Sequence, residues 1–240
     1  MIKKIISSAV LAATASFTLH AQADVSATVT LVSDYVYNGV SSTDNNPTVQ
    51  ASVDWYNDAG FYVGVWGSGL DKNAFSGAEV ELDYYAGYAN SLTDALAFDV
   101  GYALYTYPGA NDSAAESDYG ELYGALTFNG KTTAKLLYSD NYFGDVGNSI
   151  ILELSHVVDL GNEYSLTLSA SETKLLDEAG NGYYGTSPSD DSYNHWGVSV
   201  AKSVAGFDVA LSYTDTNIDE AFWGDTADAR AVLSVSRTFE

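Results

Sequence analysis

Apolar and polar side chains alternate along almost the whole chain after its first 23 residues. Val80, Leu82 and Tyr84 fall on one side of this alternation, and Glu81 and Asp83 fall on the other. A period of two residues places successive side chains on opposite faces of a β-strand. Since no segment shows a convincing period of 3.6 residues, the pattern predicts an all-β protein.

The alternation predicts twelve strands, and the connections between them alternate between short and long. Because consecutive connections of an antiparallel sheet lie at opposite rims, an even strand number with this loop pattern is typical of an outer-membrane barrel. We therefore expect a closed antiparallel up-and-down transmembrane β-barrel of about twelve strands, with short periplasmic turns and long extracellular loops. The predicted strands span residues 25–37, 48–57, 61–70, 79–90, 95–106, 118–128, 132–140, 149–158, 164–175, 193–202, 207–215 and 229–239.

A period of two does not by itself say which face meets lipid. Strands of roughly 10 residues, tilted about 45°, are long enough to cross a bilayer core. Closure of the sheet also pairs the backbone polar groups where no water is available. If the apolar set turned inward instead, the same pattern would describe a soluble periplasmic binding barrel.

The N-terminal segment has the order of a secretory signal. Lys3 and Lys4 precede an apolar run that ends at Leu19, and Ala21 and Ala23 follow it. The run has about 15 residues, whereas a membrane-spanning helix needs about 20, so cleavage is favoured over a retained anchor. We expect export to the outer membrane of a Gram-negative bacterium. The predicted domains are a cleaved signal peptide, residues 1–23, and an outer-membrane barrel, residues 24–240.

Composition narrows the classes of function. The 240 residues include 32 acidic and 9 basic side chains and no cysteine, which gives a net charge of -23. The absence of cysteine excludes a thiol nucleophile, a disulfide framework and a cysteine-built metal site. A nucleic-acid partner is not expected, because phosphate binding needs clustered Lys and Arg.

Six segments of the chain share a family pattern: SDYVYNGVS (33–41), PTVQAS (47–52), GFYVGVWGS (60–68), ELDYYAGY (81–88), YTYPG (105–109) and YGELY (119–123). These segments resemble the TorF family of proteobacterial porins. The similarity extends over most of the mature chain and is densest over residues 33–124. It implies an outer-membrane barrel with a pore, and it supplies no catalytic residue. Asn38 stands where family members usually have Arg, and Glu240 follows the aromatic residue on which such barrels commonly end.

If the apolar faces meet lipid, the opposite faces line a lumen that is rich in carboxylates. Such a wall raises the local cation concentration and repels anions, so it predicts a cation-preferring diffusion channel for small hydrophilic solutes. Four bulky aromatic residues are expected to point inward and narrow this lumen: Tyr62, Trp66, Tyr85 and Tyr123. The expected pore-lining residues are Asp34, Asp54, Glu79, Glu81, Asp83, Asp99, Glu121, Glu153 and Asp208, with Lys135 as the mid-strand counter-charge.

Two alternatives stay open for these charges. The carboxylates would also be solvated in a wet barrel without selectivity, or in a non-conducting surface barrel whose acidic loops bind a partner or stabilise the envelope. The expected partners are outer-membrane lipid and lipopolysaccharide, together with small hydrophilic solutes or cations.

The sequence gives little support for an enzyme. His156 and His195 are the only histidines after residue 23, and Ser192 or Ser199 could approach His195. No nucleophile elbow of the form G-x-S-x-G is present, so we expect no enzyme and no catalytic residue. The long loops are acidic but lack the spaced calcium-binding pattern, so no metal and no cofactor are expected.

Overall fold

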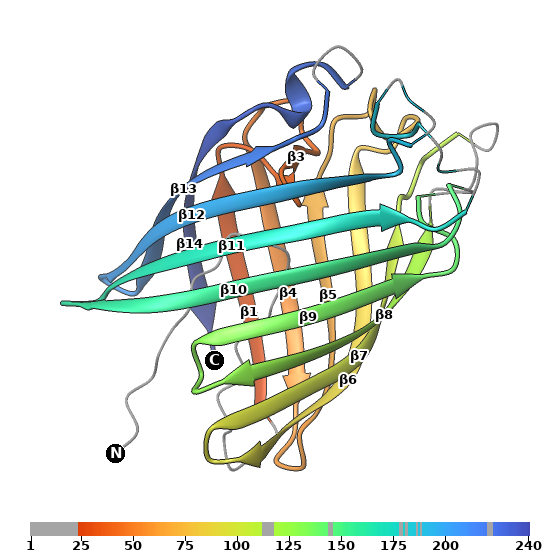
Figure 1. Ribbon diagram of the computed structural model, residues 1–240. Helices are drawn as coiled ribbons and strands as arrows, with labels where there is room; N and C mark the ends of the chain where they lie inside the picture. The colour runs from red at the N-terminus through yellow and green to blue at the C-terminus, as the bar shows by residue number, and fades with distance from the viewer. Residues whose placement is uncertain are drawn as a thin grey trace.

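A computed structural model describes residues 24–111, 118–143, 146–177, 180, 182–185, 187, 189–219 and 223–240, so the predicted signal peptide lies outside the described residues. Twelve strands form one closed antiparallel barrel in which β1 pairs with both β14 and β4 (Figure 1). The wall strands are β1 (Asp24–Val32), β4 (Thr48–Tyr56), β5 (Phe61–Gly69), β6 (Val80–Thr93), β7 (Leu96–Thr106), β8 (Tyr119–Phe128), β9 (Thr132–Ser139), β10 (Ser149–Gly161), β11 (Tyr164–Leu175), β12 (Ser192–Val204), β13 (Phe207–Thr216) and β14 (Arg230–Phe239). The predicted fold class is confirmed.

Short and long connections lie at opposite rims of the barrel. The strands meet in short turns at one rim, and the C-terminal end of β14 and the start of β1 lie at this same rim (Figure 1). One short turn contains Asn129 and Gly130 at φ 51° and 63°, the left-handed backbone that such two-residue hairpin turns require. The long connections include a short 3-10 helix, η2 (Gly224–Ala227). Within the described residues, no helix is long and apolar enough to cross a membrane.

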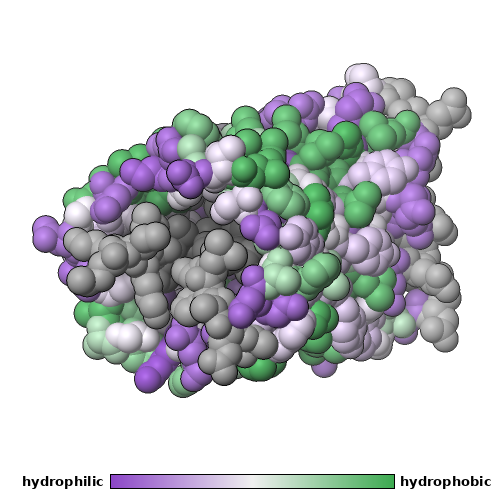
Figure 2. Space-filling view, turned by 90° about the horizontal axis from the view of Figure 1, so that it is seen from below, coloured by the Kyte–Doolittle hydropathy of each residue, from purple (hydrophilic) through white to green (hydrophobic). Residues whose placement is uncertain are grey.

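The apolar set of each strand faces outward. On β10, Leu152 and Leu154 are exposed, whereas the neighbouring Ile151 is fully buried inside the barrel. Figure 2 shows hydrophobic side chains gathered on the outer wall, with hydrophilic ones more frequent toward the ends. This placement differs from that of a soluble barrel, which would turn the same apolar set inward. An exposed hydrophobic wall is the surface that hydrocarbon favours.

The predicted C-terminal end of the first strand is wrong. It was expected to reach residue 37, but β1 stops at Val32, and residues 33–47 leave the wall and fold into the barrel. This segment, here called the inward hairpin, contains the two-stranded sheet of β2 (Val36–Tyr37) and β3 (Val40–Ser41). Its turn residues Asn38 and Gly39 have φ values of 44° and 85°. Asn-Gly is the favoured pair for such a turn, so local turn chemistry overrides the strand alternation here.

A charge on the outer wall tests which solvent that wall meets. Leu154 and Leu160 are both exposed residues of β10, at 50% and 53%, but Leu154 is near the middle of the strand and Leu160 lies at a β-bulge next to a turn. In a bilayer, Leu154→Arg should lower the free energy of unfolding by roughly 2–4 kcal/mol, and Leu160→Arg by about 0–1 kcal/mol. Denaturant titration of protein folded into lipid vesicles measures both, and equal small losses would contradict a lipid-facing wall.

Candidate functional site

The inward hairpin is held together at its base by Asp34. One carboxylate oxygen of Asp34 accepts hydrogen bonds from the hydroxyls of Ser41, at 2.6 Å, and Thr43, at 2.8 Å. Thr43 in turn accepts a hydrogen bond from the backbone N–H of Tyr35 at 3.0 Å. Asp34, Ser41 and Thr43 are all buried. These bonds to an ionised acceptor make the hairpin compact, because charge-assisted hydrogen bonds are stronger than neutral ones.

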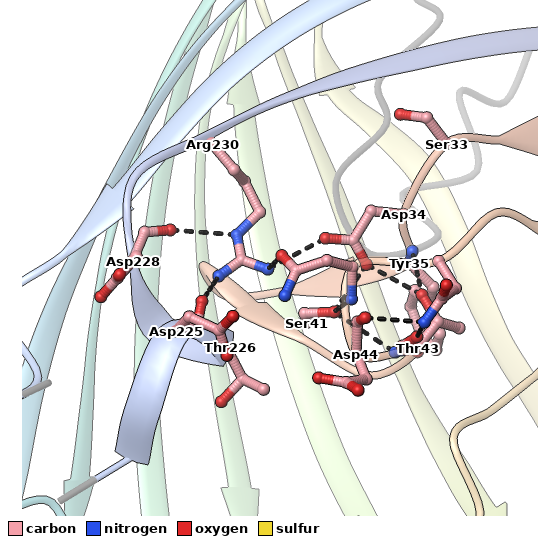
Figure 3. A network of polar contacts seen from close by, with 12 residues as sticks. Ser33, Asp34, Tyr35, Ser41, Thr43, Asp44, Asp225, Thr226, Asp228 and Arg230 are labelled. Atoms are coloured by element: carbon pink, nitrogen blue, oxygen red, sulfur yellow. Dashed lines mark hydrogen bonds and ion pairs between the residues drawn. The ribbon is translucent and has the colours of Figure 1, made fainter.

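Arg230 ties this base to the barrel wall. It lies at the start of β14, and its guanidinium reaches the other oxygen of Asp34 at 3.0 Å and the side-chain oxygen of Asn45 at 2.6 Å. It also donates to the backbone carbonyls of Asp225, within η2, and Asp228, directly after it. Figure 3 shows Arg230 pointing from the wall toward the hairpin, with Asp34 between it and the hydroxyls. Both side chains of the ion pair are buried, so we call this pair the latch.

The tip of the hairpin presses against the wall formed by β11, β12 and β13. A Cβ on Gly39 would lie 2.3 Å from Thr216 and 2.8 Å from the His195 ring, so only glycine fits there. His195 is buried between two hydroxyls, with Nδ1 3.3 Å from Ser171 and Nε2 2.6 Å from Thr214. The expected approach of Ser192 or Ser199 to His195 is therefore corrected, because neighbouring strands β11 and β13 supply its partners.

The hairpin also reaches toward the opposite wall. Tyr35 packs edge-on against Trp66 of β5, with ring centroids 5.3 Å apart. The tip and the Tyr35 end therefore contact different sides of the barrel, and the hairpin crosses the lumen. Small cavities beside the hairpin are about 10 Å³ each, which is room for roughly one water molecule.

An aromatic cap closes the same end of the barrel around the hairpin. Rings from several long loops and strand ends meet in it, including the stacked pair of Phe75 and Tyr107, whose centroids are 5.3 Å apart. Tyr184 and Tyr193 form a second contact at 4.6 Å. Aromatic pairs add to the stability that their burial gives. The members of the cap are Phe75, Tyr107, Tyr119, Tyr142, Phe143, Tyr183, Tyr184, Tyr193 and Trp223.

Three carboxylates lie beneath the hairpin on one side of the lumen. Glu81 and Asp83 come from β6 and Glu121 from β8, and all three are buried, with Glu121 fully shielded at 0% exposure. Glu81 accepts a hydrogen bond from the Tyr107 hydroxyl at 3.1 Å. Burial, and next the charge of Glu81, raise the pKa of Tyr107 well above its usual value, so this hydroxyl stays a donor. We call these three carboxylates the acidic wall.

Three of the four expected aromatic residues lie nearer the short-turn rim and form a belt with two further acids. The Tyr62 hydroxyl donates to Asp99 at 2.6 Å and lies 2.5 Å from the Tyr123 hydroxyl. Tyr85 donates to Asp54. Lys135 lies 4.7 Å from the centre of the Tyr123 ring. The belt therefore consists of three tyrosines, two acids and Lys135, all of which the sequence predicts to face the lumen. The fourth predicted aromatic residue, Trp66, instead packs against the hairpin.

Glycines on adjacent strands explain why these tyrosines fit inside the barrel. The cross-strand partner of Tyr62 is Gly87, and a Cβ there would lie 2.2 Å from the Tyr62 hydroxyl. Gly101 stands in the same relation to Tyr123, where the separation would be 2.4 Å. The rings therefore lie flat along the wall over backbone that has no side chain. Aromatic residues commonly cover strand glycines in this way.

The remaining predicted lining residues divide between the lumen and the rim. Glu153 and Asp208 are partly buried on inward-facing positions, and Ser203 donates a hydrogen bond to Asp208. Glu79 does not line the lumen as expected. It precedes β6, its side chain is 72% exposed, and it lies 3.8 Å from Lys72 in the same loop. The alternation had placed it with Glu81, but the strand begins only at Val80, so the inward parity does not extend to it.

Sequence reasoning missed Arg230 as an interior charge. Its signal was weak, because Arg230 begins the last strand and only the folding of residues 33–47 brings Asp34 to it. Among the described residues, no group of three or more His, Cys, Asp or Glu is arranged to hold a metal ion.

Comparisons with known proteins agree with the barrel. A family model described as "Bacterial protein of unknown function (Gcw_chp)" matches residues 17–239, and it does not carry the TorF name. No curated protein matches the chain.

Similar solved structures are porins of low sequence identity. A structure of the KdgM porin is 12% identical with a TM-score of 0.55, and the match covers 90% of this chain and 99% of that one. A NanC porin is 8% identical with a TM-score of 0.58, and the match covers 90% and 100% of the two chains. A third structure, the KdgM porin in complex with disordered oligogalacturonate, is 9% identical with a TM-score of 0.53, covering 90% and 99%. At these identities the likeness shows the fold alone.

The tyrosine and glycine pairing predicts the effect of a single methyl group. Gly87→Ala should destabilise the barrel by roughly 1–3 kcal/mol, because its Cβ would also lie 2.7 Å from the Val100 backbone oxygen and has no room. Gly124→Ala is the control, since the nearest atom there is 3.9 Å away. Denaturant titration compares the two variants, and an equal effect of both would contradict the close packing of Tyr62.

Proposed function

Because the chain belongs to the Gcw_chp family, whose description assigns no function, we propose its function from the lumen: an outer-membrane porin for small hydrophilic solutes that favours cations. The family description and the distant porin folds leave the solute open. The proposal includes export by the N-terminal signal, a place in the outer membrane, and contact of the apolar wall with lipid and lipopolysaccharide. It includes no catalytic activity.

The excess of inward carboxylates is the observation that carries the proposal. Asp54, Asp99 and Glu153 add their carboxylates to those of the acidic wall. Of the basic groups in the described part of the lumen, Lys135 lies over the Tyr123 ring and the guanidinium of Arg230 is already bound to Asp34. A low-dielectric wall around a narrow lumen focuses such a field, which concentrates cations and repels anions. We therefore expect this lumen to pass cations rather than acidic sugars. Oligogalacturonate, with which one KdgM structure is in complex, is a polyanion that this field would repel.

A non-conducting surface barrel is the second candidate, and the filled end of the lumen favours it. The inward hairpin and the aromatic cap occupy the end that carries the long loops. For solutes to pass, the hairpin has to move or the gaps beside it have to widen. We propose that the latch of Asp34 and Arg230 sets how often this happens.

Neutralising the lumen tests cation preference. In a planar bilayer with a salt gradient, the combined substitutions Glu81→Gln, Asp83→Asn, Asp99→Asn and Glu121→Gln should move the reversal potential toward that of the anion. The reason is that the focused negative field is lost. Glu79→Gln, at the exposed rim, is the matched control and should leave the potential unchanged.

The outcomes of this experiment separate the two candidates. Stepwise conductance supports a porin, and an unmoved reversal potential in the fourfold variant would refute selectivity by these carboxylates. Correctly folded protein that is electrically silent under all conditions would instead support the non-conducting barrel.

Breaking the latch tests the role of the hairpin. Arg230→Met leaves Asp34 buried without its ionic partner, which destabilises such pairs by about 3–5 kcal/mol, so the hairpin should detach and single-channel conductance should rise. Arg230→Lys should raise it less, because it keeps the charge. Arg237→Met is the control, since Arg237 lies over the rings of Phe207 and Phe239 at the other rim. Conductance that stays the same in Arg230→Met would contradict the latch.

A further inference from the structure

We infer that the outer face of β11 to β14, at the short-turn rim, binds the headgroup of an anionic phospholipid from the periplasmic leaflet. The inference uses the membrane placement proposed above but not conduction, because the site lies outside the barrel. We call the set of two basic and three aromatic side chains that form it the basic patch: Lys202, Arg237, Tyr164, Phe207 and Phe239.

Both cations of the basic patch point to the outside of the wall. Lys202 follows the buried Ala201 on β12 and has the outward parity of the exposed Val200. Arg237 is exposed and has the outward parity of Phe239 on β14. β12, β13 and β14 are neighbours in the sheet, and the end of β14 marks the rim (Figure 1). The two cations therefore lie on one side of the barrel, where its apolar wall meets the polar boundary of the membrane.

Aromatic rings hold the two cations against the wall. The Lys202 ammonium lies 4.4 Å from the centre of the Tyr164 ring and donates to the Tyr164 hydroxyl at 3.4 Å. The central guanidinium carbon of Arg237 lies 5.3 Å and 5.1 Å from the ring centres of Phe207 and Phe239. Such contacts stabilise a cation without using its N–H groups. The planar N–H fork of arginine therefore stays available for the oxygens of a phosphate.

In the described part of the chain, no carboxylate forms an ion pair with Lys202 or Arg237. The one other basic side chain at an outward position of the described wall strands is Lys174, which lies toward the long-loop rim and pairs with Asp191 at 3.4 Å. Asp208, on β13 between the two cations, is turned to the lumen. The basic patch is thus a local positive charge on a chain whose net charge is -23. An anion at this rim finds its attraction here.

The strand register places the two cations at a spacing that suits one headgroup. Lys202 is the cross-strand partner of Val209, and Val209 is the partner of Val235 on β14. Arg237 follows two residues later on the same face. Two strand spacings of roughly 4.8 Å and a two-residue step of about 6.8 Å separate the two Cα atoms by about 12 Å. A headgroup between them has one long basic side chain on each side.

The wall above the patch offers room for the acyl chains. Leu211 of β13 and Leu233 of β14 are cross-strand partners, and both are exposed on the outer face. They continue from Val209 toward the middle of the wall. Hydrocarbon chains attached to a bound headgroup would pack along this column, whereas a free phosphate would leave it unused. The charge and the column together favour a phospholipid over a free anion.

The charge of the patch also favours an anionic over a zwitterionic lipid. The ammonium of phosphatidylethanolamine offsets the charge of its own phosphate, whereas phosphatidylglycerol keeps a net negative charge. Each Lys or Arg near an anionic lipid surface raises binding roughly fivefold. We therefore expect a preference for phosphatidylglycerol that depends on both Lys202 and Arg237.

Native mass spectrometry of the complete folded barrel in detergent tests this preference. With the two lipids carrying the same acyl chains, wild type should retain one phosphatidylglycerol with an affinity roughly fivefold or more above that for phosphatidylethanolamine. Lys202→Gln combined with Arg237→Gln should bring this ratio close to one, and each single variant should give an intermediate ratio. Lys174→Gln is the matched control, because it removes an outward charge at the other rim and should retain the preference.

Each outcome decides the inference. Equal affinities in wild type, a preference that survives in the double variant, or an equal loss in Lys174→Gln would overturn it. Displacement of the lipid by an equal concentration of inorganic phosphate would also overturn it, because the site would then take a free anion. If the double variant does not fold, wild type at high salt gives the answer: screening should release phosphatidylglycerol more than phosphatidylethanolamine, and unchanged retention would contradict the patch.

The lipid site and the proposed channel can fail separately. Selective retention of phosphatidylglycerol by a barrel without conductance would refute the channel and keep the site. Conductance without lipid preference would do the reverse.

Discussion

The closure of the sheet is the constraint on which the rest of the structure depends. A β-strand in hydrocarbon needs a hydrogen-bonded neighbour on both sides, because each unpaired backbone group there costs several kcal/mol. β1 meets this need by pairing with β14 on one side and β4 on the other. Once the ring is closed, every wall position faces either outward or inward. A period of two in the sequence then becomes an apolar exterior around an acidic interior.

The interior is divided into two unlike sides, and this division places the hairpin. Small side chains line β12 and β13, and Gly197 and Ser212 there border a small cavity together with Val36 of the hairpin. Tyrosines and carboxylates occupy β5 to β8, where glycines such as Gly87 make room for rings. The hairpin therefore fills the space that the small side chains of β12 and β13 leave free. On the side of β5 to β8 it covers the acidic wall. Arg230 fixes this position through one buried ion pair.

The wall could be predicted closely from the sequence, and the interior only in part. Alternation alone identified the strands and the inward parity of Glu81, Asp83 and Glu121, because parity along a strand is a local property. It failed at Glu79, where the strand had not yet begun, and at residues 33–37, where an Asn-Gly turn and the hydroxyl partners of Asp34 outweigh the pattern. The pairing of Asp34 with Arg230 joins residues 196 positions apart, so no local pattern could reveal it.

The most direct measurement is the solvent contact of alternate residues along β10. The chain has no cysteine, so single cysteines at positions 152, 153, 154 and 155 can carry spin labels without a background. The protein is reconstituted into vesicles, and the collision rate of each spin label with oxygen, which concentrates in lipid, is compared with its collision rate with a water-soluble nickel complex. We expect labels at 152 and 154 to be more accessible to oxygen, and those at 153 and 155 to be shielded from it. Reversed parity, or four labels that all meet water, would contradict a lipid-facing wall around a polar lumen.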